Sequence, residues 1–283
     1  MTNFFKALGV GLLLALVFII SQSSDLKQYE TFFVTILGVA TFIFGIFIGF
    51  SISERSSRID KIRENDSAER SQLISISLCA KEISKDFYNS VLEKIDEYLM
   101  ATLDYKIWDY HLTQTQFENL FSVIAKHNPE GEKDKILTSQ MISGLNEILV
   151  SRKNTIGIIE DRLSAFEWTA LTFLSAVILI SLAALNSGGF LIFSVVMFLS
   201  LSLALLLSLL YSLDNLSWKE EDRIFEPYSK TFESIGLVRY YPEALITQKR
   251  VKNFHGKDYR KGIMPKEYPD MSEKKIEIVK NNS

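Results

Sequence analysis

The residue types that most often carry out catalysis are few in this sequence of 283 residues. The three histidines, His111, His127 and His255, stand in unrelated polar contexts, and each is more simply a surface or interface residue than a ligand. The single cysteine, Cys79, excludes an internal disulfide and a cysteine-rich metal site, and its apolar neighbours indicate a packed thiol. The chain contains no phosphate-binding glycine loop, HExxH motif or nucleophile elbow. We therefore expect no enzyme, no metal site and no cofactor.

Two stripes of residues on the apolar segment 31–52 form the most informative pattern in the sequence. At about 100° per residue, Gly38, Gly45 and Gly49 fall on one narrow helix face. Gly45 and Gly49 make a GxxxG motif, and small residues let a neighbouring helix approach closely. The sequence predicts that these glycines are helix-packing residues.

Phe42, Ile46 and Phe50 form the second stripe, which lies about 80° around the helix from the glycines. If copies of the helix surround an axis, these bulky side chains predict a pore constriction that closes by excluding water. Ordinary apolar residues that face lipid or pack against protein are the alternative interpretation of both stripes.

The second stripe continues into charged residues if the helix runs straight beyond the apolar segment. Asp60 and Glu64 extend the stripe, whereas Arg58 points away from it. Carboxylates that line a cytoplasmic vestibule favour cations. Because arginines alternate with Asp60, Glu64 and Asp66, a solvated and mutually paired helix surface is the simpler interpretation of these three acids.

Four apolar runs supply the helices that would position these stripes, at residues 4–20, 31–52, 168–185 and 190–213. A hydrocarbon core of about 30 Å needs about 20 helical residues, and a helix satisfies its own backbone groups in lipid. We predict four transmembrane helices. The first run, which contains Lys6 and precedes the small residues Ser21 and Ser23, also fits a cleaved signal peptide.

The distribution of positive charge predicts the orientation of the spans. The links 21–30 and 186–189 carry Lys27 as their single basic residue. The opposite ends of the spans are flanked by basic residues, namely Arg55, Arg58, Lys61, Arg63, Arg152, Lys153 and Arg162. Both termini and the long middle segment are therefore predicted to be cytoplasmic.

The predicted fold is an all-α membrane protein with two transmembrane hairpins and a cytoplasmic helical bundle between them. The expected parts are hairpin 1 (1–52), a cytoplasmic helical region (53–166), hairpin 2 (167–213), a cytoplasmic post-membrane segment (214–246) and a basic polar tail (247–283). Thr113 to Gln116 resembles a capping box, which predicts a helix start. A helical pattern from Asp134 runs without proline into the third span, and the tail is expected to be extended.

Composition limits the remaining functions. Apolar residues make up 47% of the chain, and the mean hydropathy of +0.13 argues against a wholly soluble protein. The net charge of −3 gives no whole-chain argument for nucleic-acid binding. Five prolines and 13 glycines disfavour an all-β fold.

With these features in place, the sequence resembles the bestrophin-like channel family. The order of elements is similar: two spans, a long helical segment, two spans and a tail. The run from Phe42 through Ile46, Gly49 and Phe50, followed by Arg58, is similar to the pore neck on the second span of bestrophins. An acidic cluster also follows the last span, at Asp214, Glu220, Glu221 and Asp222.

The resemblance implies an ion channel that is a homo-oligomer, pentameric in the family pattern, with small inorganic ions and the lipid bilayer as its partners. The chain looks closer to poorly characterised bacterial relatives than to the established channels, which implies a multi-pass protein of the plasma (inner) membrane. The Asn-Pro-Phe-Gly segment and acidic run that bind calcium in animal members are absent, so no calcium site is expected. The vertebrate relatives suggest anions, in contrast to the carboxylates of the predicted vestibule.

Two other functions stay open. The chain could be a non-conducting, membrane-anchored scaffold or signalling protein that acts through its cytoplasmic helical region. An enzyme of lipid or envelope metabolism is the weakest hypothesis, because the sequence contains no acid–base or metal set.

Overall fold

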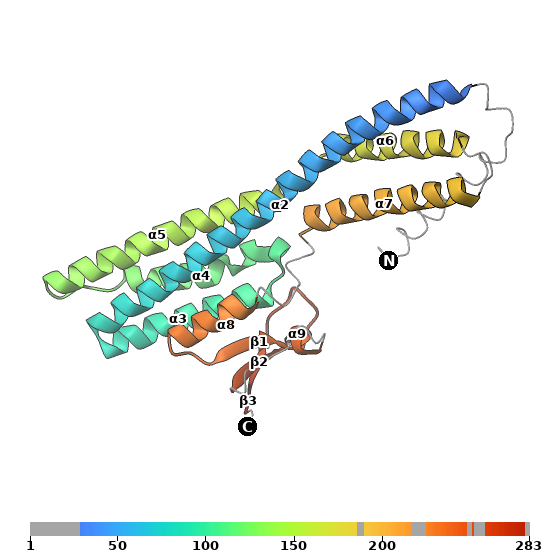
Figure 1. Cartoon of the computed structure of the whole chain (residues 1–283). Helices are drawn as coiled ribbons and strands as arrows, with labels where there is room; N and C mark the ends of the chain where they lie inside the picture. The colour runs from blue at the N-terminus through green and yellow to red at the C-terminus, as the bar shows by residue number, and fades with distance from the viewer. Residues whose placement is uncertain (1–28, 186–189, 217–224, 248–250, 252–257, 281–283) are drawn as a thin grey trace. The chain divides into compact units, whose positions relative to one another are not determined.

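The computed structural model describes residues 29–185, 190–216, 225–247, 251 and 258–280 (Figure 1). The contacts within the chain divide it into two compact units. Residues 1–59 and 162–217 form the first, which we call the apolar unit. Residues 60–161 and 218–283 form the second, which we call the charged unit.

Helix α2 contributes to both units and runs from Glu30 to Ile83 without a break. No proline occurs in this stretch, and its last glycine is Gly49. Residues 50–83 of α2 therefore include neither proline nor glycine, the residues that most often interrupt the backbone hydrogen bonds of a helix. The helix satisfies its own backbone both in the apolar segment and in the charged segment that follows.

The apolar unit consists of residues 30–59 of α2 with helices α6 (Ala165–Ala184) and α7 (Phe190–Asp214). Ala40, Phe44 and Ile48 are buried at a spacing of four, which places them on one side of α2. They share an apolar cluster with residues from the segment before α6 and from α6 and α7: Leu163, Leu171, Ile178, Leu179, Leu182, Val196, Leu203 and Leu210.

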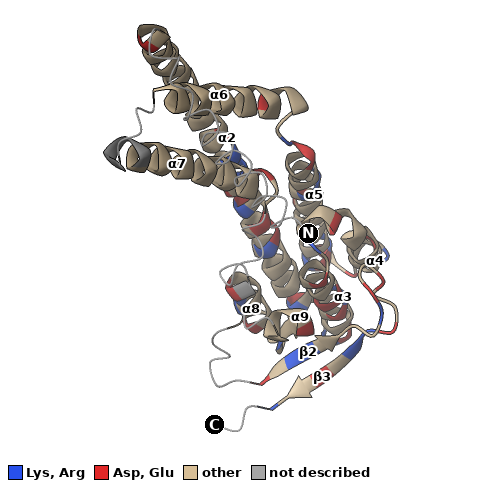
Figure 2. Ribbon diagram, turned by 90° about the vertical axis from the view of Figure 1, so that its right-hand side faces the viewer, with Lys and Arg blue, Asp and Glu red and all other residues tan. Residues whose placement is uncertain are grey.

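Three helices of the described residues are long and apolar enough to cross a membrane. Their bounds are Glu30–Ile83, Ala165–Ala184 and Ser194–Asp214, and they contain most or all of the predicted runs 31–52, 168–185 and 190–213. Figure 2 shows that the described ribbon of α7 is free of charged residues over most of its length. The first predicted span, residues 4–20, lies outside the described residues.

The charged unit consists of a helical bundle and a small sheet. Its helices are residues 60–83 of α2, α3 (Lys85–Asp104), the 3-10 helix η2 (Ile107–Thr113), α4 (Gln114–Ala125), α5 (Glu132–Glu160) and α8 (Phe225–Ser234). Their apolar stripes meet in one core, whose fully buried members include Leu73, Ile95, Leu120 and Leu145. Between residues 73 and 99, apolar side chains recur every three or four residues, and they form the buried faces of two bundle helices.

The sheet of the charged unit was not predicted, and it adds three short strands to a fold that is otherwise mostly helical. Strand β1 (Arg239–Pro242) precedes the short helix α9 (Glu243–Thr247) and pairs parallel with β2 (Tyr259–Ile263). Strand β3 (Lys275–Val279) pairs antiparallel with β2. Strands β2 and β3 lie in the segment 247–283 that was expected to be an extended tail, and the expectation is wrong for these two strands because they pair in a sheet.

Two local expectations about helix boundaries also need correction. Helix α4 begins at Gln114 as predicted, but the Thr113 side chain makes no cap bond to it. The helical pattern from Asp134 does not continue into the third span, because α5 ends at Glu160 and a new helix begins at Ala165. A capping box between Ser164 and Glu167, which was not predicted, starts that helix.

Candidate functional site

The bulky stripe of α2 is exposed in the apolar unit. Phe42 is 69% exposed, Ile46 45% and Phe50 73%. The residues of α2 that are buried in the unit, such as Phe44, point about 160° away from the centre of this stripe at 100° per residue. The stripe thus lies on the side of α2 that the described part of its own chain leaves uncovered.

The glycine face of α2 is open as well. A Cβ atom added at Gly38, Gly45 or Gly49 would have no described heavy atom within 4 Å. The glycines therefore do not serve a close approach to α6 or α7. Their role in helix packing stays a prediction, and its partner would be a second copy of the chain or a segment outside the described residues.

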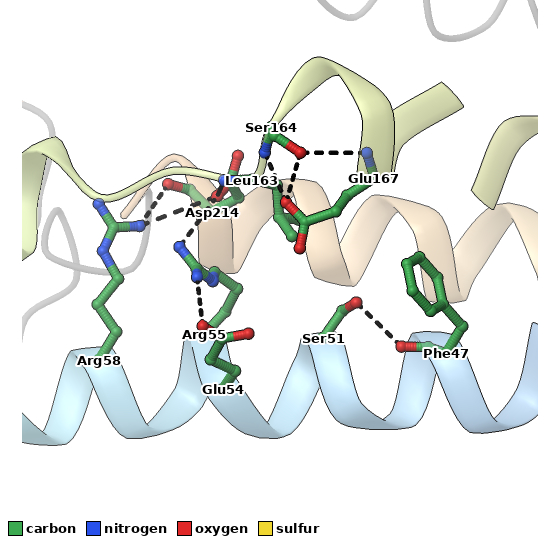
Figure 3. Close-up of polar contacts among 9 residues, drawn as sticks. All are labelled: Phe47, Ser51, Glu54, Arg55, Arg58, Leu163, Ser164, Glu167 and Asp214. Atoms are coloured by element: carbon green, nitrogen blue, oxygen red, sulfur yellow. Dashed lines mark hydrogen bonds and ion pairs between the residues drawn. The ribbon is translucent and has the colours of Figure 1, made fainter. Parts of the chain in front are cut away.

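A buried charge cluster follows the apolar segment of α2 (Figure 3). Arg55 and Arg58 are 3% and 4% exposed, and Asp214, the last residue of α7, is 4% exposed. The Nη1 atom of Arg58 donates a hydrogen bond of 2.9 Å to the backbone carbonyl of Asp214. Atoms Nη1 of Arg55 and Nη1 of Arg58 lie 3.8 and 4.0 Å from the Asp214 carboxylate oxygen Oδ1. We call these three residues the Asp214 cluster.

The Asp214 carboxylate also binds the segment that leads into α6. The backbone N–H of Leu163 donates to Oδ1 at 2.9 Å, one residue before the capping box of Ser164 and Glu167 (Figure 3). Buried charges are tolerated when they are paired and hydrogen-bonded. One carboxylate therefore ties α2, the start of α6 and the end of α7 together at a single point of the apolar unit.

The predicted vestibule residues Asp60 and Glu64 belong to the charged unit, and both are exposed. Asp60 forms an exposed ion pair of 3.4 Å with Arg63, as expected for a paired helix surface. Asp66 differs from the expectation of a solvated acid. It is half-buried, lies 3.3 Å from Nε of Arg70 and accepts a hydrogen bond from the Tyr228 hydroxyl.

The remaining candidate residues have structural partners. His127 stacks on Phe87 with ring centroids 4.1 Å apart and lies 3.2 Å from the Asp134 carboxylate. Cys79 is buried in the bundle core, in agreement with the packed thiol expected. The part of the chain that the structure describes contains no group of three or more His, Cys, Asp or Glu residues that could hold a metal ion. Outside that part lie His255 and the acids Glu220, Glu221 and Asp222.

Nothing in the sequence connects Arg58 with Asp214, because 156 residues separate them. Glu69 and Arg152 were likewise not predicted as partners in one buried hydrogen-bonded network of the charged unit. The only available signal was the presence of charged residues in line with the apolar stripe of a bundle helix. Position along a helix does not reveal a partner on another helix.

The comparisons with known proteins identify the family. The family model for the bestrophin-like domain matches residues 4–216, well over half of the chain. The chain therefore belongs to the bestrophin-like family, as the order of its spans and the stripe of α2 had suggested. This is a family of membrane proteins of the bestrophin channel kind rather than of enzymes. Neither the search of curated proteins nor that of solved structures found a match.

Proposed function

We propose that the chain forms a homo-oligomeric ion channel in which α2 lines the pore and Phe42, Ile46 and Phe50 form the constriction. The observation that carries this proposal is the exposure of the stripe on the side of α2 that faces away from α6 and α7. Large apolar side chains that converge on an axis exclude water from a narrow passage, and ions cross when the passage widens.

The stripe has a polar continuation just beyond the predicted span, at residues that would line the cytoplasmic mouth of the pore. Ser53 and Ser57 follow Phe50 at helical spacing, and both are exposed. Asp60 and Glu64 follow in the charged unit, so a vestibule on that side would attract cations.

The oligomer and its location are part of the same proposal. A ring of copies, five in the family pattern, would place the open glycine face of α2 against a neighbouring subunit. Positive charge at the ends of the spans supports cytoplasmic termini and an inner-membrane location. The native mass of the protein in detergent tests the ring directly. A monomer or dimer would contradict it.

Reconstitution into planar bilayers tests conduction. We expect single-channel currents from the wild type, and higher conductance or loss of closure when Phe42, Ile46 and Phe50 are all replaced by alanine. Phe198→Ala is the matched control, because Phe198 is 70% exposed on α7 and lies outside the proposed pore. Absence of current from both the wild type and the triple variant would favour the scaffold function, in which the charged unit binds another protein.

A further inference from the structure

Glu69 of α2 is a carboxylate buried inside the charged unit, with 3% of its surface exposed. Two phenol hydroxyls hold it from different elements. Tyr98 of α3 donates to Oε1 at 2.6 Å, and Tyr110 of η2 donates to Oε2 at 2.5 Å. A carboxylate accepts such bonds in its ionised form, and each bond favours that form.

Arg152 of α5 lies behind one of these hydroxyls and is 1% exposed. Its Nη1 atom donates to the Tyr98 hydroxyl at 2.5 Å and to Thr113 Oγ1 at 2.9 Å. The guanidinium also lies over the rings of Tyr98, Tyr110 and Phe117, at 5.3, 4.8 and 5.2 Å from their centroids. Aromatic faces stabilise a buried guanidinium through cation–π attraction.

The hydroxyl of Tyr98 therefore stands between the buried cation and the buried anion. Arg152 donates to Tyr98, and Tyr98 donates to Glu69. We call Glu69, Tyr98, Tyr110 and Arg152 the Glu69 relay. It joins α2, α3, η2 and α5 through one chain of hydrogen bonds, whose direction depends on where the protons lie.

Other charged groups also face the relay. Asp66 lies on the same helix and raises the pKa of Glu69 by charge repulsion, while Arg70 pairs with Asp66 at 3.3 Å. Tyr228 of α8 donates its hydroxyl to Asp66. For Glu69 itself, burial is the largest influence and raises the pKa, against the hydroxyls of Tyr110 and Tyr98 and the charge of Arg152, which lower it.

Proton uptake would change the hydrogen bonds of the relay. As a carboxylate, Glu69 accepts from both tyrosines; as a neutral acid, it carries a proton of its own that needs an acceptor. Because Tyr98 already accepts from Arg152, its hydroxyl hydrogen would have to turn to another acceptor, or Tyr110 would have to release its bond. One bound proton therefore alters the ties between α2 and its neighbours in the bundle.

We propose that Glu69 is a proton-sensing residue, and that its protonation changes how α2 is held by α3, η2 and α5 and so regulates the opening of the pore. The second half of this proposal rests on the proposed function, because it needs α2 to line a pore. The first half stands on the geometry of the relay alone. The proton comes from solvent on the side of the charged unit and binds one Glu69 oxygen.

Infrared difference spectroscopy of the purified full-length protein tests the sensor without any need for conduction. Lowering the pH from about 8 to about 5 should produce a protonated-carboxyl band that Glu69→Gln removes. Glu130→Gln is the matched control, since Glu130 is exposed in a turn and should leave the band in place. A band that persists unchanged in Glu69→Gln would overturn the proposal.

Tyr110→Phe keeps the ring beside Arg152 and removes one hydroxyl donor. It should move the midpoint of the Glu69 band to higher pH by about one unit, because a lost hydrogen bond to the carboxylate favours the neutral acid. This variant keeps the test decisive if Glu69→Gln does not fold. An unchanged midpoint would count against the relay.

Ion flux from proteoliposomes tests the coupling. The wild-type flux should vary with the pH on the side of the charged unit. In Glu69→Gln, most of this variation should be lost, and the flux at every pH should resemble that of the wild type at low pH. Equal pH dependence in both proteins would overturn the coupling. No flux from the wild type at any pH would contradict the pore, and the infrared result would still decide whether Glu69 binds the proton.

Discussion

The two units bury charge in different ways. In the Asp214 cluster, two arginines face one aspartate, and backbone groups of Leu163 and Asp214 complete the bonding. In the Glu69 relay, the anion accepts from two phenols, and a hydroxyl separates it from the arginine. Two cations and a backbone N–H around the first carboxylate suit a fixed joint between helices. The two donors that the described residues supply to the second carboxylate are both hydroxyls, which suits a group that gains and loses a proton.

Removal of Arg152 should have the largest effect on stability. Arg152→Ala leaves Glu69 buried without its cation and empties the space between three aromatic rings, so we expect a loss of about 3–5 kcal/mol in the free energy of unfolding. Chemical denaturation in detergent measures it. Lys153→Ala is the control, because Lys153 is the exposed neighbour on the same helix. A loss below about 1 kcal/mol would show that the relay contributes little to the bundle.

Asp214→Asn should cost about 1–3 kcal/mol. The amide oxygen can still accept from the Leu163 N–H, but the negative charge that faces Arg55 and Arg58 is lost. Thermal unfolding of the full chain in detergent measures the effect. In a double-mutant cycle with Arg55→Gln, the two losses should add to more than the loss in the double variant. Simple additivity would mean that the Asp214 cluster does not act as a unit.

The pH dependence of stability should report on the buried carboxyl of Glu69. Because burial raises the pKa of Glu69 above its ordinary value of 4.5, the folded state binds a proton that the unfolded state releases between those two values. As the pH falls from neutral through the raised pKa toward 4.5, this group should make folding more favourable. Denaturation midpoints of the wild type and Glu69→Gln at several pH values check this sign. A difference between them that does not vary with pH would contradict it.

Arg260 provides a smaller test of how the sheet is attached. Its guanidinium binds both oxygens of Asp96 on α3 at 2.6 Å, and Arg260→Lys should cost about 1–2 kcal/mol because lysine cannot make both bonds. The exposed pair of Lys133 and Glu82 is the comparison. Lys133→Ala should change the free energy of unfolding by less than about 1 kcal/mol. Denaturation of both variants under the same conditions compares their losses in the free energy of unfolding. Equal losses would contradict the expectation that the Arg260 contact contributes more.

The membrane helices could be predicted from the sequence because lipid imposes a length and a composition that stand out in the chain. The stripe of Phe42, Ile46 and Phe50 could be predicted because a helix repeats every 3.6 residues or so. The sheet could not, since its strands are short and rich in charge, as in Tyr259–Ile263. The attachment of the sheet to the bundle depends on tyrosines and cations that reach carboxylates on distant helices, such as the contact from Arg260 to Asp96.

The charge clusters show the same limit. Arg58 and Asp214 stand at the ends of two predicted spans, and only the packing of α2 with α7 brings them together. Glu69 lies in line with the apolar stripe of its helix, which indicates burial but not which residues of other helices bind it. Partners of this kind are fixed by tertiary structure, which the periodicity of a single helix does not contain.

Gly262 is a position at which one small substitution should disturb the attachment of the sheet to the helices. The ring of Tyr240 occupies the space where a side chain at this position would lie: an added Cβ would be 1.8 Å from the Tyr240 hydroxyl oxygen and 2.6 Å from Cζ. That hydroxyl donates to Asp104 of α3 at 2.5 Å, and Lys274 reaches the same carboxylate at 2.7 Å. The single methyl group that Gly262→Ala introduces should therefore displace the phenol ring of Tyr240. This change should loosen the C-terminal strands from the helices although no charged residue of the chain is substituted.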